Sequence, residues 1–234
     1  KLSDDIRKYL PGKYGNLEFK KCPITIADLA NHTSGLPRLP ENLISQPNFN
    51  PLDPYKNYSK EMLFEYLKTV SIKTKPGSVY EYSNLGAALE GLILERITGK
   101  TLKQLLDDVI LTPFGMQYTS LTISKDREGL KCTGYNADGT ATPFWDLRDM
   151  SAAGGIKSTP GDMIKYLKAN VESKALDIRL SHKVTTDSTI MQQVGLNWHR
   201  DSLNNKLDVI WHNGGTYGFS TYCGFSKDEN LGIV

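Results

Sequence analysis

Residues 75–100 constrain the fold more than any other stretch of the chain. Pro76 and Gly77 predict a turn, because proline presets φ and glycine accepts the positive φ that a tight turn often needs. The apolar residues that follow are spaced for one face of a helix: Leu85, Leu89, Leu92, Ile93 and Ile97. Gly99 is expected to end this helix, since glycine adopts the left-handed C-terminal conformation at little cost.

Tyr82, Ser83 and Asn84 lie where a short β-prone segment, residues 79–82, passes into this helix. Side chains at such a junction project from a well-anchored element, which suits a phenol and an amide that meet a ligand. Tyr-x-Asn is nevertheless a weak pattern on its own, since short motifs recur by chance. An ordinary packed Tyr82 and a capping Asn84 explain the same stretch, so both interpretations stay open at this point.

Composition narrows the classes of protein that the chain can be. Its 234 residues suffice for one large domain or two small ones, and 39% hydrophobic with 23% charged residues is typical of a globular protein. A net charge of +2 without a basic run gives no indication of nucleic acid or of an anionic membrane as partner. No apolar run is long enough to span a bilayer.

Cysteine and histidine spacing argues against a metal site. The three cysteines are Cys22, Cys132 and Cys223, an odd number of distant residues that predicts neither a disulfide framework nor a paired metal motif. The four histidines also lack the spacing of metal ligands, so we expect no metal.

Helical patterns come first along the chain and strand patterns come last. Helices are expected to start at residues suited to capping: Ser3, Thr25, Ser59, Thr101 and Thr159. Segments 195–199, 207–212, 218–225 and 231–234 are strand-like, with the spacing of an antiparallel meander, and another strand is expected at 119–123. This order favours the α+β class over alternating α/β. We expect a single domain over residues 1–234, with a mainly helical and loop part at 1–190 and an antiparallel strand part at 195–234.

A second polar cluster, from His212 to Gly215, follows an apolar run near the end of the chain. Two glycines in a strand let another backbone or a ligand approach closely. A histidine there could lie beside an acyl oxygen, and a nearby backbone N–H could donate to an oxyanion. The alternative is a hairpin with an ordinary edge histidine. His32, in contrast, lies in the turn 31–37 and is expected to be structural, because no partner for catalysis is in view.

Five blocks occur along the chain in the order Asn-His-Thr-Ser-Gly-Leu-Pro (31–37), the Tyr-x-Asn block (76–86), Pro-Phe-Gly-Met (113–116), Ala-Ala-Gly-Gly-Ile-Lys-Ser-Thr (152–159) and His-Asn-Gly (212–214). Together they resemble the serine hydrolases of the class C β-lactamase and penicillin-binding-protein family, which includes DD-peptidases and esterases. The resemblance implies an α+β fold of the β-lactamase/DD-peptidase type, with an antiparallel sheet flanked by helices and a mainly helical region. It also implies that the fold is truncated at both ends.

The resemblance implies a role for each residue of the site. Tyr82 would act as general base or proton relay, and neighbouring cations would have to make its proton mobile, since a phenol has a pKa near 10. Asn84 would hydrogen-bond the substrate and help to position the catalytic lysine. His212 would support Tyr82 and the leaving group, and the N–H of Gly215 would form half of the oxyanion hole. Substrate-binding positions are expected at Asn213, Gly214 and Tyr217.

The nucleophile of this family is a serine in a Ser-x-x-Lys motif, which this sequence does not contain. The nearest segments are 71–74 and 124–127, and neither has lysine in the fourth place. We therefore expect an interior fragment whose Ser-x-x-Lys segment precedes Lys1, and we expect the chain to be inactive alone.

The function implied is acyl transfer by a serine hydrolase of the β-lactamase, DD-peptidase or esterase type, through a covalent acyl-enzyme in the parent protein and without a cofactor. Its substrates would be β-lactams, D-amino peptides or esters, and its location extracytoplasmic, periplasmic or secreted. The alternative is a non-catalytic penicillin-binding-like module that binds peptide or cell-wall fragments. An unrelated α+β binding module would not explain five ordered blocks.

Overall fold

A computed structural model describes residues 1–204 and 206–234. Its α-helices are α1 (Ile26–Ala30), α2 (Lys60–Leu67), α3 (Asn84–Thr98), α4 (Leu102–Leu106), α5 (Pro160–Glu172) and α6 (Leu176–Ser181). Short 3₁₀ helices cover Ile6–Tyr9, Glu41–Leu43, Lys125–Leu130 and Arg148–Ala153, and a π turn covers Asp107–Leu111. No described helix is long and apolar enough to cross a membrane.

The main sheet is formed by the last part of the chain. Its strands are β5 (Gln193–Gly195), β6 (Trp198–Leu203), β7 (Leu207–Thr216), β8 (Phe219–Ser226) and β9 (Leu231–Ile233). Each strand pairs antiparallel with the next in sequence, which confirms the predicted meander and the α+β class. Two small hairpins lie outside it: β1 (Glu18–Phe19) with β2 (Cys22–Pro23), and β3 (Gly134–Tyr135) with β4 (Ala141–Thr142).

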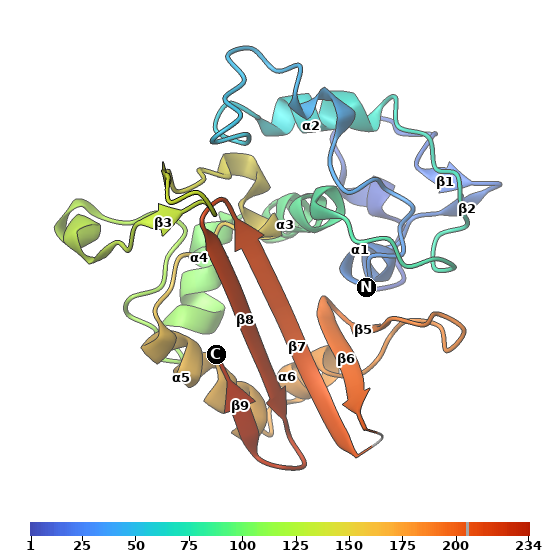
Figure 1. Ribbon diagram of the computed structural model, residues 1–234. Coiled ribbons are helices and arrows are strands. Elements are labelled where there is room, and N and C mark those ends of the chain that lie inside the picture. Colours follow the sequence, from blue (N-terminus) through green and yellow to red (C-terminus); the bar gives the residue numbers. More distant parts are fainter. Residues whose placement is uncertain (205) are drawn as a thin grey trace.

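Helices cover one face of this sheet. Figure 1 shows α5 and α6 behind the strands, with α3 crossing behind their upper ends. Leu167 of α5 packs there against Ile210 and Phe225 of the sheet in a small core of its own. The larger core lies among α1, α2, α3 and the N-terminal segment.

The N-terminus of α3 is fixed by its sequence. Ser83 is the N-cap, with its Oγ accepting from the Gly86 N–H at 2.9 Å, so the capping residue is Ser83 rather than Asn84. Gly99 ends the helix at φ 68°, as predicted. Gly91 allows close packing in between, because a Cβ on it would lie 2.3 Å from the Ala152 Cβ. The helix is therefore held at both ends and along its side.

The other helix starts mostly follow the sequence. Thr25, Ser59, Thr101 and Thr159 cap α1, α2, α4 and α5 as predicted. The expected first helix is different: Asp5, not Ser3, caps a 3₁₀ turn, because its carboxylate accepts from the Arg7 N–H.

Three strand predictions are wrong. Segment 195–199 is not one strand, because Leu196 and Asn197 adopt positive φ of 47° and 73° and form the turn between β5 and β6. Segment 119–123 makes only an isolated bridge from Ser120 to Lys157. Residues 79–82 are outside the named strands and lead directly into the cap of α3. The β-prone residues in these segments favour an extended backbone, but they do not specify a strand with which the segment pairs.

Candidate active site

Tyr82 and His212 come from different parts of the chain and meet at the N-terminus of α3. Tyr82 immediately precedes the Ser83 cap, and His212 lies in the middle of β7. Their ring centroids are 6.2 Å apart, with the ring planes inclined by 47°. Because the cap fixes one residue and the sheet register fixes the other, both rings are held by regular secondary structure.

Two further histidines join them. The His32 ring centroid lies 4.2 Å from that of Tyr82, and the His199 ring stacks on His212 at 5.2 Å with an interplanar angle of 11°. The Tyr80 hydroxyl lies 2.8 Å from Nε2 of His199. We call Tyr80, Tyr82, His32, His199 and His212 the imidazole cluster.

His32 has the structural role that the sequence predicted, and a second contact that it did not. It adopts φ 55° just beyond α1, and its Nδ1 accepts from the Ser83 N–H at 3.2 Å. Its own carbonyl accepts from the Glu81 N–H at 2.7 Å. These bonds tie the turn after α1 to the start of α3, and the same imidazole thereby packs on Tyr82.

His199 was missed by the sequence analysis. In the register of β6 and β7 it faces Trp211, the residue next to His212, and the two rings lie 4.7 Å apart. Had β6 been predicted to start at Trp198, this pairing would have placed His199 beside the predicted site. Because the turn at 196–197 was not predicted, the start of β6 and the pairing of His199 were not predicted either.

Burial keeps the cluster uncharged. It lowers the pKa of His32 to about 3 and that of His199 to about 4, in both cases with a smaller contribution from the neighbouring imidazole of His212. Burial also lowers the pKa of His212, against an opposing hydrogen bond with the Asn213 backbone. At neutral pH these imidazoles are therefore neutral acceptors and donors rather than cations.

Arg38 supplies the cation that the histidines do not. Its guanidinium carbon lies 5.1 Å from the centroid of the Tyr82 ring, within cation–π distance. Burial raises the pKa of Tyr82, and the positive charge of Arg38 opposes that rise. Tyr82 is accordingly a phenol at rest, with a neighbouring charge that lessens the cost of losing its proton.

In the part of the chain that the structure describes, no strand pairs with one edge of β7 beyond Trp211, next to His212, and we call this segment the free edge. Pairing of β7 with β6 ends at Trp211, whereas pairing with β8 continues to Thr216, next to the turn formed by Tyr217 and Gly218. The pair that flanks such a two-residue turn exchanges hydrogen bonds, and bonded pairs alternate with non-bonded ones along an antiparallel ladder. It follows that the N–H groups of Asn213 and Gly215 point away from β8, toward the free edge.

The remaining predicted residues lie along this edge and at the start of α3. Asn213, Gly214, Gly215 and Tyr217 are all exposed. A Cβ on Gly214 would lie 2.9 Å from the Thr221 hydroxyl, whereas one on Gly215 would meet nothing nearer than 3.9 Å. Asn84 lies beside Tyr55, where its side chain opposes the rise that burial causes in the pKa of Tyr55.

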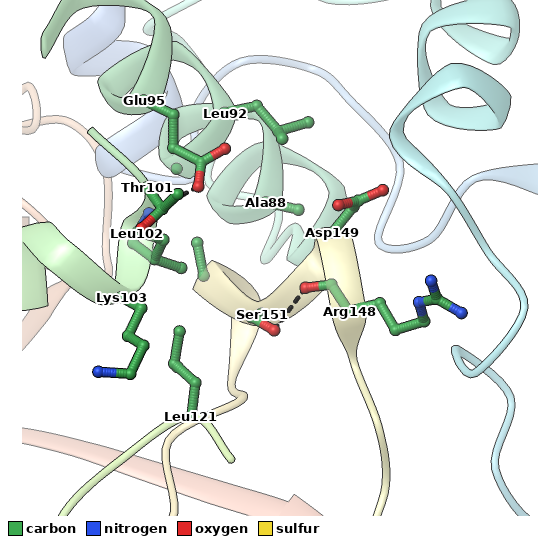
Figure 2. A pocket seen from close by; sticks show the side chains of 12 residues that line it. Ala88, Leu92, Glu95, Thr101, Leu102, Lys103, Leu121, Arg148, Asp149 and Ser151 are labelled. Carbon is green, nitrogen blue, oxygen red and sulfur yellow. Dashed lines mark hydrogen bonds between the residues drawn. The ribbon is translucent and has the colours of Figure 1, made fainter. Parts of the chain in front are cut away.

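A separate cavity of about 180 Å³ lies beside α3, and a different set of residues lines it. Figure 2 shows Glu95 and Leu92 of α3, Leu102 of α4 and Ser151 around it. The Glu95 carboxylate already accepts from the Leu102 N–H at 2.6 Å. None of the predicted site residues lines this cavity, so it does not mark the site.

Metal ligation finds no support in the part of the chain that the structure describes. No group of three or more His, Cys, Asp or Glu side chains there is arranged to hold a metal ion.

Comparison with known proteins gives a consistent picture. The profile of the family described as "Beta-lactamase" matches residues 1–234. The chain is 30% identical over 253 residues to the D-alanyl-D-alanine-carboxypeptidase/endopeptidase AmpH of Escherichia coli (strain K12), covering 99% of this chain and 63% of AmpH. It is 26% identical over 245 residues to Protein flp of Staphylococcus aureus (strain MRSA252), covering 46% of flp. The chain thus spans roughly half to two thirds of the length of these relatives.

Solved structures share the fold. A β-lactamase/D-alanine carboxypeptidase from Yersinia pestis, complexed with citrate, superposes with a TM-score of 0.83 at 26% identity, covering 99% of this chain and 69% of that one. A class C β-lactamase superposes with a TM-score of 0.80 at 20% identity, covering 99% and 69%. The β-lactamase/DD-peptidase fold expected from the sequence is therefore confirmed.

Proposed function

The chain belongs to the β-lactamase family, and on that premise we propose that the protein is an acyl-transfer serine hydrolase of the β-lactamase, DD-peptidase or esterase type. The observation that carries the proposal is the approach of Tyr82 and His212, 6.2 Å apart between ring centroids, beside the free edge of β7. This proximity supports a site in which Tyr82 would transfer protons, His212 would hydrogen-bond and the β7 backbone would donate to the acyl oxygen.

In the proposed reaction, a serine supplied from outside residues 1–234 attacks the acyl carbon. Its oxygen bonds to that carbon, and its proton passes to Tyr82, whose own proton is accepted by His212. As the bond from the acyl carbon to the leaving group breaks, Tyr82 gives its proton to the leaving group and takes back the proton held by His212. The oxygen of a water molecule then bonds to the acyl carbon, the bond from that carbon to the serine oxygen breaks, and a proton of the water passes through Tyr82 to the serine, which completes hydrolysis.

The remaining roles follow from position. The N–H of Gly215 would donate to the acyl oxygen as negative charge develops on it, and a donor aimed at such an oxyanion contributes about 10²- to 10³-fold to rate. Asn84 would hydrogen-bond the acyl side of the substrate, with Asn213, Gly214 and Tyr217 along the same edge. Since burial favours the phenol form of Tyr82, its most direct role is to protonate the leaving group.

The substrate class and compartment rest on the relatives. AmpH is named as a D-alanyl-D-alanine carboxypeptidase and endopeptidase, and the Yersinia pestis structure as a β-lactamase/D-alanine carboxypeptidase. We propose substrates of the same chemistry, namely D-amino peptides, β-lactams or simple esters, and an extracytoplasmic location. Residues 1–234 alone, which contain no Ser-x-x-Lys, are proposed to be inactive.

The test compares two forms of the protein. Protein expressed from the complete coding sequence and pure residues 1–234 are incubated with a fluorescent penicillin and with a p-nitrophenyl ester. The complete protein should form a covalent adduct that a sulfonyl fluoride prevents, and residues 1–234 should form none. Turnover by residues 1–234 that resists the sulfonyl fluoride would contradict the serine route. Reversible penicillin binding without an adduct by the complete protein would favour the non-catalytic binding module.

A further inference from the structure

Three aromatic side chains from distant parts of the sequence lie in a row next to the proposed site. Trp145, between β4 and the 3₁₀ helix Arg148–Ala153, lies in the middle of this row. Its ring centroid is 5.4 Å from that of Tyr55 and 4.9 Å from that of Tyr217, in edge-to-face geometry at both contacts. We call Tyr55, Trp145 and Tyr217 the aromatic wall.

Hydrogen bonds fix Trp145 to the loop that carries Tyr55. The Trp145 Nε1–H donates to the Leu52 carbonyl at 3.1 Å. The next residue, Asp146, donates its backbone N–H to Oδ1 of the buried Asp53 at 2.9 Å. Two bonds between adjacent pairs of residues hold these segments in register, so the contact between the rings is not a chance encounter of mobile loops.

The turn that carries Tyr217 is fixed to the β3–β4 hairpin. The Thr142 hydroxyl donates to the Tyr217 carbonyl at 3.0 Å. Gly218 makes this approach possible, because a Cβ on it would lie 2.2 Å from the Thr142 Oγ1. Figure 1 shows β3 beside the upper ends of β7 and β8, where this turn lies. All three segments are therefore positioned before any substrate binds, which reduces the entropy lost on binding.

The wall adjoins the residues proposed to bind the acyl side of the substrate. Tyr55 lies beside Asn84, which opposes the rise that burial causes in its pKa, and Tyr217 follows the proposed oxyanion donor Gly215 by two residues. Tyr82 and His212 instead have proposed roles in proton transfer to the leaving group. A group attached to the acyl carbon would consequently extend toward the wall.

We propose that the aromatic wall selects substrates whose acyl group carries an aromatic ring. Exposure along the wall rises from 4% at Tyr55 to 43% at Tyr217, so its outer end can receive a ring while its inner end stays packed. Aromatic rings prefer the same edge-to-face and offset contacts that the wall already makes internally. This inference rests on the proposed function, because it needs a reacting acyl group at Asn84 and Gly215.

The experiment compares two esters with the same leaving group, p-nitrophenyl phenylacetate and p-nitrophenyl acetate, hydrolysed by the complete protein. Each kcat/KM is divided by the rate of hydroxide hydrolysis of the same ester, which removes the intrinsic difference in reactivity. We expect the unmodified protein to prefer the phenylacetyl ester by about 10-fold or more, because burial of a phenyl group against apolar surface has an effect of that order.

Variants then locate the preference. Trp145→Ala and Tyr217→Leu should each lower the ratio by about 2- to 10-fold, toward one, and Tyr217, on an exposed turn, can be changed with little risk to folding. Tyr118→Ala is the matched control, since Tyr118 is also exposed, at 52%, and packs on Arg127 outside the wall. Its ratio should stay at that of the unmodified protein.

Two failures are distinguishable. Hydrolysis of both esters with a ratio near one, or a ratio that neither Trp145→Ala nor Tyr217→Leu changes, would overturn the aromatic preference and leave the proposed function standing. Absence of hydrolysis that a sulfonyl fluoride can block would overturn both.

Discussion

The imidazole cluster contains Tyr82, and the aromatic wall lies beside Asn84, two residues further along the chain, yet the two regions are built differently. In the cluster, His32 and His199 are buried, at 1% and 5% exposure, while Tyr80, Tyr82 and His212 are half-buried. Hydrogen bonds to backbone and hydroxyl groups hold the two buried histidines. The wall is held by contacts between its rings and by hydrogen bonds of the loops that carry them, and its residues range from buried to exposed. In the proposed function, the cluster would exchange protons in a fixed geometry, whereas the wall would offer an uncharged surface for recognition.

The supporting elements differ in the same way. Cluster residues lie at the end of α1, at the cap of α3 and on paired strands, where caps and register fix the position of each side chain. Wall residues lie on a loop, a connection and a turn. Loops tolerate substitutions without loss of the fold. The proposed roles would therefore assign the chemistry to residues held by regular secondary structure, and substrate recognition to residues that can be substituted more freely.

The largest expected effect is on the cluster. In the complete protein, His212→Asn should lower kcat for p-nitrophenyl acetate by about 10²- to 10³-fold, because it removes an acceptor for the Tyr82 proton. His182→Asn is the control, since that histidine bonds Asn170 at 2.8 Å outside the cluster, and its kcat should stay within about threefold. A kcat for His212→Asn that matches that of the control would contradict the role of the cluster in proton transfer.

The second effect is a fall in stability at mildly acidic pH, to which the histidines of the cluster contribute and the aromatic wall does not. The pKa of His32 is about 3 in the folded protein, below its ordinary value of 6.5, so below about pH 6.5 the unfolded chain binds a proton that the folded chain does not. Stability should therefore fall as pH drops from about 6.5 toward 4, by up to about 1.4 kcal/mol per pH unit for each such histidine. The charges that face His32 are Arg38 and the imidazoles of His199 and His212, none of which favours its protonation.

Urea unfolding of residues 1–234 between pH 7 and 4.5 measures this slope. His32→Asn should flatten it, because asparagine tolerates the φ of 55° and can accept from the Ser83 N–H, but does not titrate. Trp145→Phe, in the wall, should leave the slope unchanged. Equal slopes for His32→Asn and the unmodified chain would show that the cluster does not titrate as described.

The third effect tests how the wall is supported. Gly218→Ala should destabilise residues 1–234 by about 2 to 3 kcal/mol, for two reasons. Alanine is strained at the φ of 74°, and its Cβ would clash with backbone and side-chain atoms of the β3–β4 hairpin. Gly139→Ala is a matched control with φ 83° and nothing within 4 Å, and should cost about 1 kcal/mol. Equal losses of unfolding free energy in urea would indicate that the hairpin does not hold the turn.

The smallest effect compares one hydroxyl from each region. Tyr80→Phe removes a bond of 2.8 Å to the buried His199 and should cost about 1 kcal/mol of unfolding free energy. Tyr217→Phe should change the unfolding free energy by less than about 0.5 kcal/mol, since Tyr217 is 43% exposed and water can solvate its hydroxyl in the folded and the unfolded state alike. Reversal of this order would contradict the contrast in burial.

Local signals in the sequence predicted most of the helical scaffold. Gly99, the capping residues Thr25 and Thr101, and the apolar stripe of α3 each specify structure over a few residues, and they are where predicted. Long-range pairing was harder. Leu196 carries no turn signal, so the β5–β6 turn was missed, and with it the position of His199 beside His212.

The site shows the same limit. The proximity of Tyr82 and His212 was expected from the resemblance, since nothing local to either residue specifies their distance. Arg38 and Trp145 were not singled out, because an arginine and a tryptophan in long loops acquire a role only when tertiary packing brings them to Tyr82 and Tyr217. Residues that act through contacts across the fold are therefore those that a single sequence reveals least.

A double-mutant cycle on Tyr82 and His212 tests most directly whether these two residues act as one unit. The acylation rate of the complete protein by a p-nitrophenyl ester would be measured for Tyr82→Phe, His212→Asn and the double variant. If the proton passes between them, the double variant should react within about threefold of the slower single variant, because the second change removes nothing further. Losses that multiply in the double variant would show that the two side chains act independently, and would contradict the proposed mechanism.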